Sequence, residues 1–77
     1  MEIKVFASIK EKIGSDTIDL FVGDSITVGE LKNHIFVDYP ELDGEVFQVA
    51  KNESFVKDDE VVTSEDTVAL IPPVSGG

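Results

Sequence analysis

Residues 26–40 read Ile-Thr-Val-Gly-Glu-Leu-Lys-Asn-His-Ile-Phe-Val-Asp-Tyr-Pro and contain the strongest helix signal of the chain. Thr27 and Glu30 have the spacing of a capping box, in which the Thr27 hydroxyl accepts from the Glu30 N–H and the Glu30 carboxylate reaches back to the Thr27 N–H. Apolar side chains then recur at helical spacing at Val28, Leu31 and Ile35. Because the residue before a proline disfavours the helical conformation, Pro40 ends the segment. The stretch therefore predicts one amphipathic helix between Thr27 and Pro40.

Alternating apolar and polar residues predict β-strands on both sides of this helix. Before it, strands are expected at 2–8 and 16–21, with 9–14 as a short connection. After it, strands are expected at 45–51, 55–56 and 67–71, with a turn at 52–54. The segment 57–66 is polar and acidic apart from Val61 and Val62, which is typical of a loop.

This order of elements in 77 residues predicts a single two-layer α+β domain, with one sheet packed on one main helix. We place the domain at residues 1–71 and an extended C-terminal tail at 72–77. One helix covers only one face of a sheet, so the second face is expected to stay open.

The open face is predicted to present an apolar patch. The alternation in 2–8 places Phe6 there, and the alternation in 67–71 places Ile71 there. Phe55 extends the patch. Contiguous exposed apolar side chains mark protein interfaces, whereas single ones are ordinary. We expect these three side chains to contact a partner.

The charge of the chain narrows the class of partner. Sixteen acidic and six basic residues give a formal net charge of −10. Such a chain repels nucleic-acid phosphates and anionic lipid, so neither nucleic acid nor a membrane is expected as a partner. A partner with basic patches is favoured, although the acidity also serves solubility alone. The first residues alternate at once and show no signal-peptide pattern, so a cytoplasmic location is expected.

Known catalytic and metal-binding patterns do not occur in the chain. It contains no cysteine, and His34 is the only histidine. No serine lies in a nucleophile-elbow motif, and the acidic run 58–60 lacks the spacing of a calcium loop. We therefore expect no metal site, no bound cofactor and no self-contained enzyme.

The remaining candidate site is the C-terminal segment Pro72-Pro73-Val74-Ser75-Gly76-Gly77. Two prolines favour an extended path, and six extended residues reach about 20 Å. The small residues that follow narrow the tail, a shape that fits a tight channel in another protein. The terminal Gly77 carboxylate is unreactive until it is converted into an acyl adenylate, and two glycines let an activating enzyme approach it closely. Composition alone leaves open whether this tail is functional or inert.

The ending Ala69-Leu70-Ile71-Pro72-Pro73-Val74-Ser75-Gly76-Gly77 closely resembles the C-terminal signature of molybdopterin synthase small subunits, the MoaD family. The opening Ile3-Lys4-Val5-Phe6-Ala7, followed by Glu11 and Gly14, resembles the first strand and loop of that family. Lys10 stands where the family often has arginine, so the charge is kept.

The resemblance implies a ubiquitin-like β-grasp fold and a role as a sulfur carrier. It implies that a ubiquitin-activating-type adenylyltransferase uses ATP to adenylate Gly77, which then becomes a thiocarboxylate. The tail, with Pro72, Pro73, Val74, Ser75 and Gly76, would enter the large subunit of molybdopterin synthase. There it would donate sulfur to cyclic pyranopterin monophosphate during molybdenum cofactor biosynthesis. Two small and two large subunits would form a heterotetramer, with the catalytic side chains on the large subunit.

Three alternatives remain open at this point. The chain resembles in outline a sulfur carrier for another pathway such as thiamin synthesis, although those carriers usually lack the Pro72–Pro73 pair. A ubiquitin-like protein modifier, conjugated through Gly77 to lysines, would share the same activation chemistry. A binding module with an inert tail belongs to a different functional class.

Overall fold

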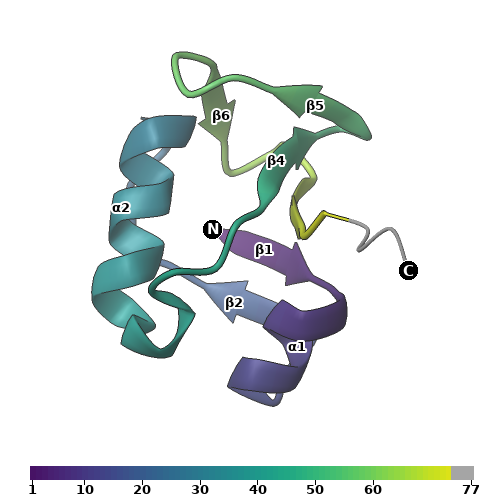
Figure 1. Ribbon diagram of the computed structural model, residues 1–77. Coiled ribbons are helices and arrows are strands. Elements are labelled where there is room, and N and C mark those ends of the chain that lie inside the picture. The colour runs from purple at the N-terminus through teal and green to yellow at the C-terminus, as the bar shows by residue number, and fades with distance from the viewer. Residues whose placement is uncertain (74–77) are drawn as a thin grey trace.

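The computed structural model describes residues 1–73, in which short strands lie to one side of one longer helix (Figure 1). Along the chain these elements are β1 (Glu2–Val5), α1 (Ala7–Ile13), β2 (Thr17–Asp19), β3 (Ser25–Thr27), α2 (Val28–Asp38), the 3₁₀ helix η1 (Pro40–Leu42), β4 (Gln48–Lys51), β5 (Ser54–Val56), β6 (Val61–Thr63) and β7 (Val68–Ile71).

The main sheet has five strands in the order β2-β1-β7-β4-β5. The central pair, β1 and β7, runs parallel with Ile3 opposite Val68, and the other neighbours run antiparallel. The sheet is therefore mixed, and α2 lies beside one of its faces (Figure 1). This arrangement confirms the predicted α+β β-grasp fold.

The core lies between α2 and the sheet. The inward-facing side chains of α2 are fully buried at Val28, Leu31 and Ile35. From the sheet, alternate residues of β1 and β7 face them and are buried at Ile3, Val5, Val68 and Leu70. Burying one such aliphatic side chain contributes roughly 1.5–3 kcal/mol, so this layer contact is the main source of stability.

Helix α2 starts and ends where the sequence predicts. The Thr27 hydroxyl accepts from the Glu30 N–H at 3.2 Å, which confirms the N-cap. The reciprocal contact differs, because the Glu30 carboxylate accepts from the Thr27 hydroxyl at 2.9 Å instead of from the Thr27 N–H. The helix ends at Asp38, two residues before Pro40.

The prediction of a connection at 9–14 is wrong, because most of it belongs to α1. The strand expected at 2–8 ends at Val5, and the chain turns into the helix at Ala7, whose φ is +51°. Burial of Ile9 against the core holds this short helix in place. Gly14 then ends it in the left-handed conformation, at φ +72°, which glycine adopts at little cost.

The prediction of a loop throughout 57–66 is also wrong. Residues Val61–Thr63 form β6, which pairs antiparallel with β3 and places Ile26 opposite Val62. Both of these side chains are buried. β3 and β6 have three residues each, which is too short for an alternating pattern to be recognised in the sequence. They form strands because they pair with each other across a long stretch of chain.

Two further strands are shorter than expected. The strand predicted at 16–21 spans Thr17–Asp19, and the strand predicted at 45–51 spans Gln48–Lys51. The turn predicted at 52–54 is confirmed as a tight hairpin turn, with positive φ at Asn52 and Glu53. This hairpin brings β5 to the edge of the main sheet.

Candidate functional site

The C-terminal segment leaves the domain from the centre of the sheet. β7 ends at Ile71, and the half-buried Pro72 and exposed Pro73 follow without regular structure. The predicted tail residues Val74, Ser75 and Gly76 and the predicted carrier residue Gly77 lie outside the described residues. Their roles therefore stay predictions, whereas the point from which they depart is described.

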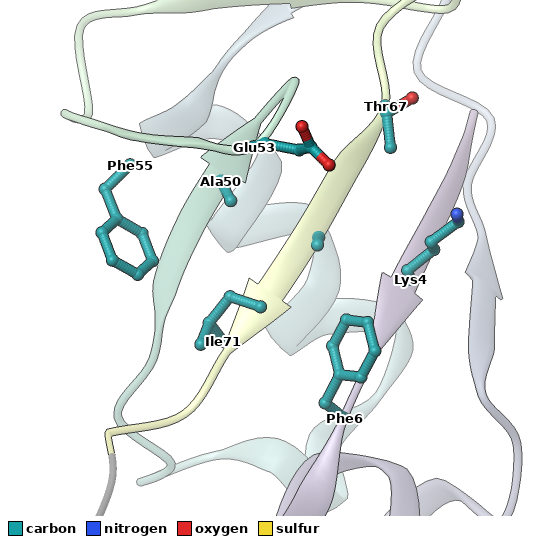
Figure 2. Close-up of a pocket in the computed structure, with 8 residues that line it drawn as sticks. Lys4, Phe6, Ala50, Glu53, Phe55, Thr67 and Ile71 are labelled. Carbon is teal, nitrogen blue, oxygen red and sulfur yellow. The ribbon is translucent and has the colours of Figure 1, made fainter.

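A hollow of about 360 Å³ lies on the face of the sheet away from α2, beside the end of β7 (Figure 2). It contains the three side chains predicted as an apolar patch: Phe6, Phe55 and Ile71. Figure 2 shows Phe6 and Ile71 near the ends of β1 and β7, with Phe55 across the sheet on β5. The structure thus brings the three residues together, and their contact with a partner stays a prediction.

Small side chains form the floor of this hollow. Ala50 and Ala69 face each other across the β4–β7 pair, and Phe55 lies opposite Ala50 in β5. Because each alanine ends at its Cβ, the larger side chains around them form a rim with space between them. The two alanines were not among the residues predicted for the site, since nothing local in the sequence shows that they become neighbours.

The hollow has an apolar end and a polar end. The apolar end is the one nearest to the start of the tail. At the other end Figure 2 shows Lys4, Glu53 and Thr67. These polar residues were not predicted as part of the site, although Lys4 shares the strand face of Phe6.

The aromatic side chains of the hollow are unusually accessible. Phe6 is 46% exposed and Phe55 is 61% exposed, although both are large apolar residues. Apolar area left open to water in one contiguous place is typical of a surface that a protein partner covers.

Helix α1 holds Phe6 in position from the side. Beyond the burial of Ile9 in the core, the helix has surface contacts with the Glu45 carboxylate, which accepts from Lys12 Nζ at 3.0 Å and from Ser8 Oγ at 3.2 Å. The hydrogen bond from Lys12 lowers the pKa of the Glu45 carboxyl, because it stabilises the ionised form. The helix therefore keeps a defined orientation next to the hollow.

The described part of the chain offers little chemistry of its own. Within residues 1–73, no group of three or more histidine, aspartate or glutamate side chains is arranged to hold a metal ion. None of the helices in that part is long and apolar enough to cross a membrane. What these residues do form is an apolar hollow next to the start of the tail.

Comparison with known proteins adds a family match over nearly the whole chain. The matching family is described as the ThiS family, and the match covers residues 3–77. The molybdopterin synthase sulfur carrier subunit of Dictyostelium discoideum is 37% identical over 84 residues, which cover 99% of this chain and 94% of that protein. Small archaeal modifier protein 1 of Haloferax volcanii is 33% identical over 87 residues, which cover 100% of both chains.

Solved structures give the same result for the fold. The crystal structure of SAMP1 from Haloferax volcanii superposes with a TM-score of 0.80 at 34% identity, covering 99% of this chain and 97% of that chain. A complex of subunits 1 and 2 of molybdopterin-converting factor from Helicobacter pylori 26695 contains a chain with a TM-score of 0.68 at 24% identity, covering 99% and 96% of the two chains. At that identity the second likeness concerns the fold alone.

Proposed function

The chain belongs to the ThiS family and is a ubiquitin-like sulfur carrier, and from this premise we propose that it is the sulfur carrier subunit of molybdopterin synthase. In this proposal Gly77 is the C-terminus of the working carrier, and its carboxylate is the group that receives sulfur. The relative from Dictyostelium discoideum, with that name and 37% identity, supports this assignment. The Pro72–Pro73 pair supports it over a carrier for thiamin synthesis.

The proposed chemistry starts from an ionised α-carboxylate, whose ordinary pKa is about 3.3–3.7. A ubiquitin-activating-type adenylyltransferase joins a carboxylate oxygen to the α-phosphorus of ATP, and pyrophosphate leaves. Sulfur at the oxidation level of sulfide, delivered by a donor, then attacks the carbonyl carbon and displaces AMP together with that oxygen. The product is a thiocarboxylate in which one sulfur has replaced one oxygen.

The acceptor in this proposal is cyclic pyranopterin monophosphate, bound by the large subunit of molybdopterin synthase. The thiocarboxylate sulfur forms a bond to a carbon of the acceptor and displaces an oxygen substituent from that carbon. Water then cleaves the bond between the Gly77 acyl carbon and the sulfur, which restores the carboxylate and leaves one sulfur on the acceptor for each carrier consumed. The carrier supplies the sulfur and the tail, and the large subunit supplies the acid and base groups. A cytoplasmic heterotetramer of two small and two large subunits is the expected assembly, and the carrier itself binds no cofactor.

One observation supports this division of roles above the others. Ile71 is both the last residue of β7 and part of the wall of the apolar hollow. A partner that covers the hollow is therefore next to the start of the tail, which supports the proposal that the tail enters the active site of that partner. A carrier that serves an activating enzyme and a large subunit in turn needs this arrangement.

The test is intact-mass measurement of the carrier after incubation with its cognate adenylyltransferase, ATP and a sulfur donor. A gain equal to the replacement of one oxygen by one sulfur is expected. The loaded carrier should then form molybdopterin from cyclic pyranopterin monophosphate only when the cognate large subunit is present. An unchanged mass with an adenylyltransferase that loads a known carrier would refute the proposal.

A protein modifier is the second candidate, because small archaeal modifier protein 1 is 33% identical over the full length of both chains. The activation step would be the same, but the Gly77 acyl group would pass to a lysine amine and form an isopeptide bond. Tagged carrier isolated from its own cells distinguishes the two. Covalent conjugates that disappear when Gly77 is deleted would favour the modifier, and free thiocarboxylate without conjugates would favour the sulfur carrier.

A further inference from the structure

The acidic chain has few lysines, and they fall into two groups: those that form ion pairs within the described residues and those that do not. Three of the six form ion pairs with the chain's own carboxylates: Lys12 with Glu45 at 3.0 Å, Lys32 with Asp58 at 2.8 Å, and Lys51 with Glu60 at 3.0 Å. Within residues 1–73, the exposed Lys4, Lys10 and Lys57 form no ion pair.

Two of these three lysines lie together beside the apolar hollow. A second hollow of about 330 Å³ is lined by Lys4, Val5, Phe6, Lys10, Asp16 and Thr17. Lys4 and Phe6 belong to both hollows, so the two form one continuous surface. The apolar docking surface therefore continues into a region with two ammonium groups.

Carboxylates share this surface and set its charge balance. Asp16 lines the second hollow and Glu53 lines the first, yet neither lies within ion-pair distance of Lys4 or Lys10. Lys4 also lines a third hollow together with Glu2 and Asp66. Two lysines and four carboxylate residues thus line this surface, a larger share of lysine than in the whole chain, which has six basic and sixteen acidic residues. An acidic partner group therefore meets less repulsion here than the composition of the whole chain implies, and it finds two lysines that form no ion pair within residues 1–73.

We infer that Lys4 and Lys10 select the docking partner, and that this partner is a protein segment presenting a carboxylate next to an apolar anchor. The anchor enters the hollow of Phe6, Phe55 and Ile71, and the carboxylate contacts Lys10 or Lys4. This inference rests on the proposed function, in which the partner is the large subunit of molybdopterin synthase. It adds the chemical groups that make the contact. It predicts that attraction between these lysines and a partner carboxylate opposes the repulsion of that carboxylate by the net negative charge of the carrier.

The test is zero-length cross-linking with a water-soluble carbodiimide, which joins an amine to a carboxylate in direct contact. The cognate large subunit and the isotope-labelled carrier are mixed, the complex is isolated by gel filtration, and cross-linked peptides are identified by mass spectrometry. The three ion pairs within the carrier serve as internal positive controls. We expect cross-links from Lys4 or Lys10 to aspartate or glutamate of the large subunit, and none from Lys57.

Each other result overturns the inference in a recognisable way. If the internal cross-links form but Lys4 and Lys10 form none with the large subunit, the inference is refuted. The proposed function stands in that case, because the complex itself has formed. Cross-links from Lys10 to a second copy of the carrier show that this surface is a self-association site. Failure of the two proteins to co-elute refutes the proposed partner as well.

Charge reversal supplies an independent measurement with a matched control. Lys10→Glu is expected to weaken binding to the large subunit by about tenfold or more at low salt. This difference should shrink as ionic strength rises. Lys57→Glu, the same change at an exposed lysine that lines neither hollow, should alter the affinity by less than about twofold. Equal effects of the two substitutions would show that only net charge matters, which contradicts the inference.

Discussion

Truncating Phe55 to alanine tests whether the apolar hollow binds the partner. The Phe55 side chain is 61% exposed in the free carrier. A phenylalanine side chain buries about 200 Å² when covered, so about 120 Å² is open for a partner to cover. At about 25 cal/mol per Å², this area corresponds to about 3 kcal/mol of binding free energy. Since 1.4 kcal/mol is about a factor of ten, Phe55→Ala is expected to raise the Kd by about a hundredfold.

The assay is isothermal titration calorimetry of each carrier variant against the cognate large subunit, with thermal unfolding measured in parallel. The part of Phe55 already buried in the carrier limits the loss of folding free energy to about 2 kcal/mol, so the variant should remain folded. Phe21→Ala is the matched control, because Phe21 is 99% exposed and does not line the hollow. An affinity within about twofold of wild type for Phe55→Ala, or an equal loss for Phe21→Ala, would refute the role of the hollow.

Three further predictions concern the tail, the core and the hairpin. One residue added after Gly77 should abolish the mass gain on sulfur loading without changing the melting temperature, and normal loading of that variant would contradict a terminal carrier group. Leu31→Ala should lower the free energy of unfolding in urea by about 2–5 kcal/mol, because Leu31 is 0% exposed and its loss leaves a cavity; a loss below about 1 kcal/mol would contradict the layer packing. The hydrogen bond from Asn52 lowers the pKa of Asp66 in the folded protein below its usual 3.8. The ionised Asp66 therefore stabilises the fold at pH values above 3.8, and this stabilisation is lost as the pH falls through the lowered pKa. Asp66→Asn should therefore lose less stability than wild type between neutral pH and about pH 3, as urea titrations at each pH would show.

The parts of the fold that were predicted correctly are those with a local physical signal. Helix α2 follows from its N-cap and from apolar spacing, both contained within a dozen residues. The faces of β1 and β7 follow from simple alternation, because successive side chains of a strand point to opposite sides. Phe6 and Ile71 were predicted to share one face from the same alternation, with Phe55 as an extension of the patch, and the structure places the three side chains around one hollow.

The sequence by itself also determined the candidate carrier group, the Gly77 carboxylate, because the ending Pro-Pro-Val-Ser-Gly-Gly is recognised without knowledge of the tertiary structure. Only the tertiary structure decided what depends on partners distant in the chain. Helix α1 forms because Ile9 finds the core, and β3 and β6 form because each supplies hydrogen bonds that the other lacks. Ala50 and Ala69 become the floor of a hollow because β4 and β7 pair in one register. Lys4 shares a face with Phe6 by local alternation, but Lys10 joins them only because residues 7–13 form a helix, which the sequence did not predict.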